Sequence, residues 1–482
     1  MTDHPTRTEL LRLARTALGD AARPDVVTRI RKTGKLTARE RMALLADAGS
    51  MVSYGTIAAV DPNDTGNPWV AETGGLDAIA TIDGHPAIIS TTDYTDHGGG
   101  YGAARLGRLF ALAREHRWPF VAFVDGGGSR ARHPRNGLGH IELSGAIGPY
   151  TLFDGMAELS GWVPTISIVS GPSFAGHASV AGFSDIVIAT RGSAIGMGGP
   201  PMVEAAIGRR LTPTELSGAQ MQYETGGIEL LAGDETEAVA TARRLLGYWH
   251  TRDTGPARSF HNQDAIASLV PSTGPYEIQP VIDTLTDPGS FIELRGGFAR
   301  ALVAGVARLN GRAIGVLASN PAENDGLIDE AAAQKINRHV ELCDAWELPL
   351  LVLIDSTGTT TRWQDKARGS YVETGLSRVH LRCIVSHQTR TVPLLSVQLR
   401  SGRGLAPALM TGYSTGASVP VFMGAWPDAE LNRADGYALV RDANAFDDII
   451  DPRETRTILA RLIRLLPLAG NREAKQHPVD SW

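Results

Sequence analysis

The chain has 482 residues, of which 43% are hydrophobic and 20% are charged, and it carries a formal net charge of −6 at pH 7. This composition is typical of a globular protein with a sizeable core, and the acidic balance without a basic run argues against a nucleic-acid partner. No stretch reaches the roughly 18 apolar residues of a membrane span, and no apolar signal core follows Met1, so we expect a cytoplasmic protein with no membrane association. Cys343 and Cys383 are too few for a disulfide framework or a zinc cage, and no metal site is expected.

The first half of the chain alternates helical segments with short apolar strands. Residues 8–47 are predicted to be helical, and Thr37-Ala38-Arg39-Glu40 is a capping-box start for a second helix. Asp83-Gly84 predicts a hairpin turn between residues 75 and 90, and residues 102–117 are predicted to form a helix. Continuous apolar runs that predict strands buried on both faces are Phe120–Val124, Ile166–Ser170 and Ile186–Ala189.

The second half repeats this order of elements. It predicts strands at 314–318, 350–354, 394–399 and 419–423 and a helix at 329–346. Matching segments, such as Val121-Ala122-Phe123-Val124-Asp125 and Leu351-Val352-Leu353-Ile354-Asp355, are offset by about 230 residues, whereas solenoid repeats have periods of about 20–50 residues. We therefore predict an α/β protein with two like domains, residues 1–255 and 277–482, a Pro- and Gly-rich linker at 256–276, and a loose tail after Leu466.

The turn after Phe120–Val124 is the first candidate binding site, because ligands gather at the carboxyl ends of strands in open α/β sheets. This turn reads Asp125-Gly126-Gly127-Gly128-Ser129-Arg130. Gly127 and Gly128 would let the backbone approach a ligand closely, and Arg130, Arg132 and Arg135 could meet phosphates. The alternative is a plain glycine turn with solvated arginines, since a glycine-rich loop alone is a weak signal.

Two further turns follow predicted strands at equivalent places in the two halves. The first contains Ala175, Gly176 and His177, and the second contains Gly404, Leu405, Ala406 and Ala408. Consecutive backbone N–H groups in such turns can stabilise a developing enolate oxygen, so we predict two oxyanion holes. Alternatively, both turns are only tight strand–helix connections. His177 is either a catalytic group beside the first hole or a histidine packed at a helix start.

Sequence motifs of several other enzyme classes are absent. The chain has no His-Glu-x-x-His metal helix, no Gly-x-Ser-x-Gly elbow and no Gly-x-x-x-x-Gly-Lys-Ser/Thr phosphate loop. Asp125 and Asp355 end equivalent strands, but carboxylates in such turns more often accept local hydrogen bonds than act as an acid/base pair. Backbone donors are therefore expected to carry the chemistry.

A set of motifs recurs along residues 25–465 in a recognisable order. They are Thr37-Ala38-Arg39-Glu40-Arg41, Asp47-Ala48-Gly49-Ser50, Asp125-Gly126-Gly127-Gly128-Ser129-Arg130, Gly233-Asp234-Glu235, Pro275-Tyr276, Asp329-Glu330-Ala331-Ala332 with Lys335, and Asp448-Ile449-Ile450-Asp451-Pro452-Arg453-Glu454-Thr455-Arg456. In this order they resemble the carboxyltransferase (β) subunit of acyl-CoA carboxylases, of the propionyl-CoA carboxylase β-chain type. The resemblance implies two tandem crotonase-like (ClpP/crotonase) domains related by internal duplication, and a homo-oligomer, commonly a hexamer built as a trimer of dimers.

The resemblance also implies an activity and its site. Such a subunit moves a carboxyl group from carboxybiotin to the α-carbon of an acyl-CoA, through enolates held by backbone donors, between the first half of one chain and the second half of its partner. Carried over to this chain, the acyl-CoA hole falls on Ala175 and Gly176 and the carboxybiotin hole on Leu405 and Ala406. The implied substrate-binding residues are Gly127, Gly128, Arg130, His177, Gly404 and Ala408. A separate biotin carboxylase and a biotin carboxyl carrier protein are the implied partners, since the chain has no Met-Lys-Met biotinylation site.

The chain departs from the resembled family at both turns. The family's Gly-Gly-Ala becomes Ala175-Gly176-His177, and its Gly-Gly-Ala-Tyr-Asp becomes Gly404-Leu405-Ala406-Pro407-Ala408. Alanine and leucine keep their N–H donors, whereas Pro407 supplies none, so the half that would hold biotin is the more altered. Two alternatives therefore stay open: a biotin-independent decarboxylase of a malonyl-type thioester, and a non-catalytic subunit of a carboxylase complex.

Overall fold

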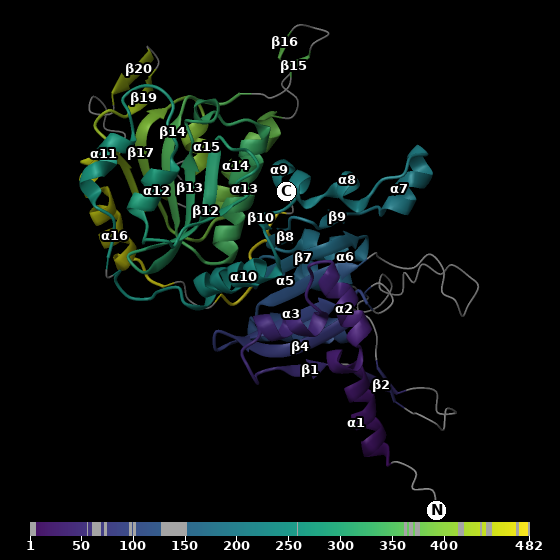
Figure 1. The fold of residues 1–482 in the computed structure, drawn as a ribbon. Coiled ribbons are helices and arrows are strands. Elements are labelled where there is room, and N and C mark those ends of the chain that lie inside the picture. The colour runs from purple at the N-terminus through teal and green to yellow at the C-terminus, as the bar shows by residue number, and fades with distance from the viewer. Residues whose placement is uncertain are drawn as a thin grey trace, which may run out of the picture. The chain divides into compact units, whose positions relative to one another are not determined.

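The computed structural model describes residues 6–54, 56–59, 69–71, 75–95, 99, 103–126, 152–257, 259–360, 364–365, 370–371, 376–412, 419–433, 436–439, 446–468 and 472–480. The chain divides into two compact units, and each is described by itself (Figure 1). Unit 1 comprises Met1–Gln222 and Leu230–Leu246, and unit 2 comprises Tyr223–Glu229 and Gly247–Trp482. The domain limits and the linker at 256–276 stay predictions.

Unit 1 is built around a mainly parallel sheet. The elements up to residue 250 are α1 (Arg7–Leu18), α2 (Pro24–Lys32), α3 (Ala38–Leu45), β1 (Val52–Tyr54), β2 (Ile57–Ala59), β3 (Trp69–Ala71), β4 (Gly75–Ile82), β5 (His85–Thr92), α4 (Ala103–His116), β6 (Phe120–Gly126), α5 (Leu152–Leu159), β7 (Thr165–Phe174), α6 (Gly176–Phe183), β8 (Ile186–Thr190), β9 (Ala194–Gly196), α7 (Pro200–Ile207), α8 (Pro213–Ser217), α9 (Ala219–Thr225), β10 (Leu230–Ala232) and α10 (Glu235–His250). The strand order is β1-β4-β5-β6-β7-β8-β10, and β9 pairs with β7.

Unit 2 is built in the same way. Its elements are α11 (Ile266–Leu269), α12 (Gln279–Leu285), β11 (Ile292–Leu294), β12 (Leu302–Leu309), β13 (Arg312–Ser319), α13 (Glu330–Ala345), β14 (Leu350–Ser356), β15 (Gln364–Asp365), β16 (Ser370–Tyr371), α14 (Leu376–Thr389), β17 (Leu394–Gly402), α15 (Ala406–Thr411), β18 (Phe422–Ala425), β19 (Glu430–Arg433), β20 (Gly436–Leu439), β21 (Asp448–Ile449) and α16 (Thr455–Leu465). The strand order of the main sheet is β11-β12-β13-β14-β17-β18-β21. Helix α13 packs on β12 and β13, and α15 packs on β14 and β17.

The two main sheets have the same topology, which confirms the predicted α/β class and internal duplication. Each sheet opens with antiparallel pairs and continues with parallel ones. The register also breaks at the same place: β6–β7 shifts between Val124 and Gly126, and β14–β17 shifts between Ile354 and Ser356. Because a bulge re-aims the backbone at the end of a strand, the turns that follow leave both sheets in a similar way.

Each half is closed by an arginine that reaches back from a late helix to an aspartate near its start. In unit 1, Asp47 accepts two backbone N–H groups of the β4–β5 turn at 3.0 and 2.8 Å and binds Arg243 of α10 at 3.2 Å. In unit 2, Asp287 accepts two backbone N–H groups of the β12–β13 turn at 2.9 and 2.7 Å and binds Arg456 of α16 at 2.6 Å. We call each set an Asp–Arg closure, and its recurrence is a second mark of the duplication.

Most of the predicted elements are confirmed. The capping box forms at Thr37 and Glu40, and the hairpin turn has φ 51° at Asp83 and 81° at Gly84, as a tight two-residue turn requires. The predicted strands of the first half lie within β6, β7 and β8, whose residues are almost all buried. The strand expected at 419–423 begins only at Phe422, because Pro420 has no N–H for a ladder. No helix among the described residues combines the length and apolarity that a membrane crossing requires.

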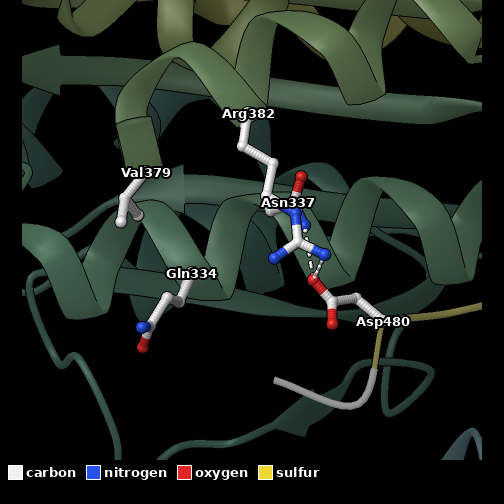
Figure 2. Close-up of a pocket in the computed structure, with 5 residues that line it drawn as sticks. All are labelled: Gln334, Asn337, Val379, Arg382 and Asp480. Atoms are coloured by element: carbon white, nitrogen blue, oxygen red, sulfur yellow. Dashed lines mark hydrogen bonds and ion pairs between the residues drawn. The ribbon is translucent and has the colours of Figure 1, made fainter. Parts of the chain in front are cut away.

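The prediction of a loose tail after Leu466 is wrong for residues 472–480, which we call the docked tail. Arg472 lies 3.1 Å and His477 lies 2.8 Å from the Asp344 carboxylate of α13. Asp480 accepts a hydrogen bond from Asn337 of α13 at 3.0 Å (Figure 2). The segment lacks apolar periodicity and so carries no local sign of packing, yet its polar side chains bind partners on a buried helix.

Candidate functional site

The turn between β7 and α6 of unit 1 has a strained backbone. Ala175 has φ 53° and ψ −121°, a conformation unfavourable for a residue with a Cβ. Its amide donates to the carbonyls of Met197 and Gly196 at 3.1 and 3.3 Å, and its carbonyl accepts from the Ser179 amide at 2.9 Å. These bonds hold the strained conformation. They also occupy the Ala175 amide, which the sequence suggests as one donor of the first oxyanion hole.

Gly176 follows Ala175 in this turn. It begins α6, and the amides in the first turn of a helix have no partner within that helix. A Cβ placed on Gly176 would meet no atom within 4 Å, so the described part of the chain leaves the space beside this residue open. The strain at Ala175 therefore presents the start of α6, with its partial positive charge, to open space.

The side chain of His177 fills the gap between this turn and the end of β6. A Cβ placed on Gly126 would lie 2.2 Å from Nε2 and 2.4 Å from Cε1 of His177, so the imidazole lies directly against the Gly126 backbone. The His177 side chain is buried, and this burial lowers its pKa to about 4, although the Asp125 carboxylate opposes the shift. The ring is therefore uncharged at neutral pH.

Asp125 anchors the end of β6 in a buried charge cluster. Its Oδ2 lies 2.7 Å from Lys35 Nζ and 3.1 Å from Arg41 Nη2, and Arg41 also binds Glu235 at 2.7 Å. Its Oδ1 is buried and has no hydrogen-bond partner among the described residues, and a Cβ placed on Gly171 would lie 2.1 Å from it. The end of β6 therefore holds a buried carboxylate beside two cations.

In unit 2 the equivalent turns meet through glycines. Gly358 and Gly404 have φ of 130° and 60°, and a Cβ on Gly404 would lie 3.8 Å from the Gly358 Cα. Leu405 has a helical φ of −84°, and its side chain is exposed. The Ala406 amide donates at 3.3 Å to a carbonyl of the same turn, and Pro407 has no N–H. Of the predicted pair of donors, this leaves at most the amide of Leu405.

Asp355 is the counterpart of Asp125, with different partners. Its carboxylate accepts from the Ser401 amide at 3.0 Å and from the Tyr276 hydroxyl at 2.8 Å, and it lies 3.1 Å from Arg400. Burial raises the pKa of Asp355, although the Arg400 charge and these hydrogen bonds favour its ionised form. Each half thus fixes the end of its central strand with a buried aspartate and a cation.

The structure brings the predicted site residues together in two groups. Ala175, Gly176 and His177 lie at the start of α6, and Gly404, Leu405, Ala406 and the half-buried Ala408 lie around the start of α15. The predicted phosphate and glycine-loop residues Gly127, Gly128, Arg130, Arg132 and Arg135 lie outside the described residues. The roles assigned to all of these residues stay predictions.

Sequence reasoning missed the cations that hold Asp125. Lys35 and Arg41 flank the α3 capping box, and Arg41 belongs to a motif already noted for its resemblance to a family. Two cations beside a helix start are usually solvated, so the sequence alone offers no reason to pair them with a strand end. Tyr276 and Arg400, which hold Asp355, were not assigned to it either, since Tyr276 lies 79 residues and Arg400 lies 45 residues away in sequence.

A small pocket of about 150 Å³ lies between α13, α14 and the docked tail of unit 2 (Figure 2). Its lining consists of Gln334, Asn337, Val379, Arg382 and Asp480. Figure 2 shows Asn337 and Arg382 converging on the Asp480 carboxylate. Sites for drug-sized ligands are typically about 300–1,000 Å³, so this pocket is too small for an acyl-CoA. None of the predicted site residues lines it.

The chain has clear relatives among known proteins. Residues 29–440 match the family model of the carboxyl transferase domain. The chain is 30% identical over 396 residues to the uncharacterized carboxylase YngE of Bacillus subtilis, covering 79% of this chain and 74% of that protein. It is 28% identical over 500 residues to the methylmalonyl-CoA carboxyltransferase 12S subunit of Propionibacterium freudenreichii subsp. shermanii, covering 92% of this chain and 91% of that subunit.

Solved structures share the fold. A single-chain, multi-domain long-chain acyl-CoA carboxylase matches with a TM-score of 0.80 at 28% identity, covering 95% of this chain but only 50% of that protein. The transcarboxylase 12S structure matches with a TM-score of 0.82 at 24% identity over 99% of this chain and 100% of that one, a likeness of fold alone. These structures confirm the expected two tandem crotonase-like domains. The family match extends from residue 29 to residue 440 and takes in the central strands and the strand-end turns of both units, so the chain belongs to the carboxyl transferase domain family.

Proposed function

We propose that this protein is the carboxyltransferase subunit of an acyl-CoA carboxylase and moves a carboxyl group from carboxybiotin to the α-carbon of an acyl-CoA. The relatives support this substrate class, since one is a methylmalonyl-CoA carboxyltransferase and another is a long-chain acyl-CoA carboxylase. The observation that carries the proposal is the turn at Ala175 and Gly176, where a strained backbone holds the start of α6 beside open space.

In the proposed reaction, the Gly176 amide stabilises the thioester oxygen while the α-carbon loses its proton. Enolate formation moves negative charge onto that oxygen, and a preorganised amide stabilises this charge more than it stabilises the neutral carbonyl. The α6 dipole adds partial positive charge at the same point. Carboxybiotin, when it is bound, supplies the CO2 and the base for the α-proton. The enolate carbon then forms the new bond to the CO2 carbon, and the thioester carbonyl is restored.

The second-half turn fits a biotin oxygen through one amide rather than two. The Ala406 amide is engaged within the turn and Pro407 has none, so we assign the binding role to Leu405 N–H. Gly358 and Gly404, both at positive φ, add no side chains of their own beside Leu405. Residues of this turn would hold the biotin ring. A single donor predicts weak binding of biotin, so that the biotin can leave again with its carrier protein.

The proposal also assigns partners. The chain has no Met-Lys-Met site of its own, so a biotin carboxylase and a biotin carboxyl carrier protein would charge the biotin and deliver it. We propose a homo-oligomer, a hexamer built as a trimer of dimers, in line with the family resemblance. In such an assembly the first half of one chain and the second half of its partner would share one reaction.

The purified full-length chain can be tested in the reverse direction without its partners. A panel of malonyl-, methylmalonyl- and ethylmalonyl-CoA is supplied, and loss of the carboxyl group is followed with and without free biotin. We expect turnover that depends on biotin and is abolished by avidin. CO2 release that ignores both reagents would replace the proposal with the biotin-independent decarboxylase. A folded chain with neither activity would point to a non-catalytic subunit.

A pair of glycine variants tests the turn itself. Gly176→Val places a branched side chain in the open space, so the fold should tolerate it while the thioester oxygen loses access to the amide. Loss of one oxyanion donor typically lowers kcat about 100–1,000-fold, and we expect at least that loss. Gly182→Val is the matched control, because Gly182 lies at the other end of α6 and also faces no described atom within 4 Å. Wild-type activity in Gly176→Val would remove the assignment of this turn.

A further inference from the structure

We infer that His177 restricts the substrate to short acyl chains, which makes it a specificity-determining residue. This inference rests on the proposed function, because it requires a thioester oxygen at the Gly176 amide. The position of the imidazole ring, its counterparts in unit 2 and its place next to the proposed donor in the chain together support this role.

The ring of His177 is wedged between two turns and has no room to retreat. β6 and β7 are parallel neighbours, Gly126 ends β6, and His177 is the second residue of α6 directly after β7. The close approach of the ring to the Gly126 backbone shows that nothing larger than a hydrogen atom fits behind it. His177 is only 3% exposed, so its ring is part of the packed interior directly below the turn.

Unit 2 shows the same place without an imidazole. Counted from the last bulged ladder pair, at Ser173 in unit 1 and Gly402 in unit 2, the counterpart of His177 is Ala406; counted from the first residue of α6 and of α15, it is Pro407. Neither residue carries an imidazole, and Ala406 is fully buried. The resembled family also has a small residue at the first turn. The fold therefore does not need an imidazole here, so a requirement of substrate binding is the better explanation for it.

A group bound at the Gly176 amide must lie beside this ring. A carbonyl oxygen that accepts a hydrogen bond lies about 2.9 Å from the amide nitrogen, and the α-carbon is only two bonds beyond the oxygen. His177 is the next residue after Gly176, so its buried ring belongs to the wall of the turn on which the acyl group would rest. Further methylenes would need the volume that the ring occupies, and Gly126 prevents the ring from moving away. The expected substrates are thioesters of small acyl groups, such as acetyl or propionyl.

His177→Ala opens this volume and reproduces the methyl group of Ala406. We would measure kcat/KM of the biotin-dependent reaction for carboxylated thioesters of the propionyl, hexanoyl and octanoyl series. An added methylene in an apolar pocket changes kcat/KM by about 10–200-fold, so the octanoyl-to-propionyl ratio should rise at least about ten-fold in His177→Ala. His177→Asn, with an intermediate volume, should give an intermediate ratio.

The matched control is His387→Ala. His387 is also a fully buried histidine packed against a glycine, Gly412, but it lies on α14 of unit 2. Its removal should lower stability as His177→Ala does, while the octanoyl-to-propionyl ratio stays at the wild-type value. A ratio compares two substrates on one enzyme, so a partly unfolded preparation does not change it.

The outcomes separate this inference from the proposed function. A wild-type enzyme that prefers the octanoyl substrate, or an unchanged ratio in an active His177→Ala, overturns the inference. If no thioester reacts with the wild type, the proposed function fails, and calorimetric binding of propionyl- and octanoyl-CoA then decides the role of His177. Octanoyl-CoA should gain about ten-fold in affinity in His177→Ala while propionyl-CoA does not, and equal changes for both would overturn the inference.

Discussion

Asp344 fastens the docked tail, and its replacement should loosen both the tail and unit 2. Its side chain is fully buried in α13. One carboxylate oxygen accepts from the Thr391 amide at 2.6 Å, the Thr391 hydroxyl at 2.8 Å and the Val392 amide at 3.0 Å. The other oxygen lies 2.8 Å from His477 Nε2, and Arg472 lies 3.1 Å from the carboxylate. Asp344→Asn would replace an acceptor for all these donors with an amide that also carries donors of its own.

The size of the effect follows from the pKa of Asp344. Burial raises this pKa, but the His477 hydrogen bond, the Arg472 charge and the bonds from Thr391 outweigh burial and lower it from 3.8 to about 2. The difference corresponds to about 2.4 kcal/mol of folding stability, at about 1.4 kcal/mol per pH unit. Because the folded pKa is depressed, this contribution is full above pH 3.8 and is lost as the pH falls toward 2. At about 2–4 °C per kcal/mol, Asp344→Asn should lower the melting temperature by about 5–10 °C at pH 7.

Differential scanning calorimetry of the full-length chain between pH 7 and pH 3 would measure this loss. Asp428→Asn is the control, since Asp428 is exposed and loses the same charge. Trypsin should also cut at Arg472 faster in Asp344→Asn than in the control, because the docked tail is released. Equal melting temperatures of the wild type and Asp344→Asn at pH 7 would refute the reasoning, as would a difference that does not shrink toward pH 3.

Substitutions at other contacts test further parts of the structure. Burial lowers the pKa of His477, but the hydrogen bond to Asp344 outweighs it, so the pKa is raised. The stability from this charged pair is therefore fully present below pH 6.5 and is lost as the pH rises. His477→Gln should therefore lower the melting temperature more at pH 6 than at pH 9, and equal losses at both pH values would contradict this. Gly126→Ala should lower the free energy of unfolding, measured in urea, by about 1–3 kcal/mol, because the new Cβ would overlap the ring of His177. The double variant Gly126→Ala/His177→Gly should regain most of that lost free energy. Absence of rescue would mean that the ring does not lie there. Arg456→Ala should destabilise by about 3–5 kcal/mol and Arg243→Ala by about 1 kcal/mol or less, because the two side chains are 4% and 27% exposed. Thermal unfolding that ranks them in the opposite order would count against the burial argument.

The parts of the fold that were predictable from sequence are those set by neighbouring residues. The Asp83-Gly84 turn and the Thr37 capping box depend on a few adjacent positions, and both form as expected. The docked tail depends on pairing across the chain, since His477 and its partner Asp344 are 133 residues apart. A polar stretch without periodicity carries no local sign of such a partner, which is why it was expected to be loose.

The candidate site was predictable in position but not in geometry. The repeat and the strand pattern placed Gly176 and Leu405 at strand-end turns, and they lie there. The positive φ of Ala175 was not predictable, because alanine does not favour it and the carbonyls that hold it belong to Gly196 of β9 and to Met197 just after that strand. The ion pair between Lys35 and Asp125 was equally unpredictable, since the two residues are 90 positions apart in sequence. Such contacts follow only from the assembled sheet.

Each Asp–Arg closure uses residues from its own half of the chain. Asp47 and Arg243 are 196 residues apart, and Asp287 and Arg456 are 169 apart, so neither Asp–Arg closure uses a residue of the other half. An ancestor of half this length could therefore have fastened its own ends and worked as a pair of identical subunits. Once the two copies were joined in one gene, the sequence of each could change independently of the other. One copy could then gain an imidazole at its strand-end turn while the other gained a proline. A symmetric pair of turns thereby became two different ones.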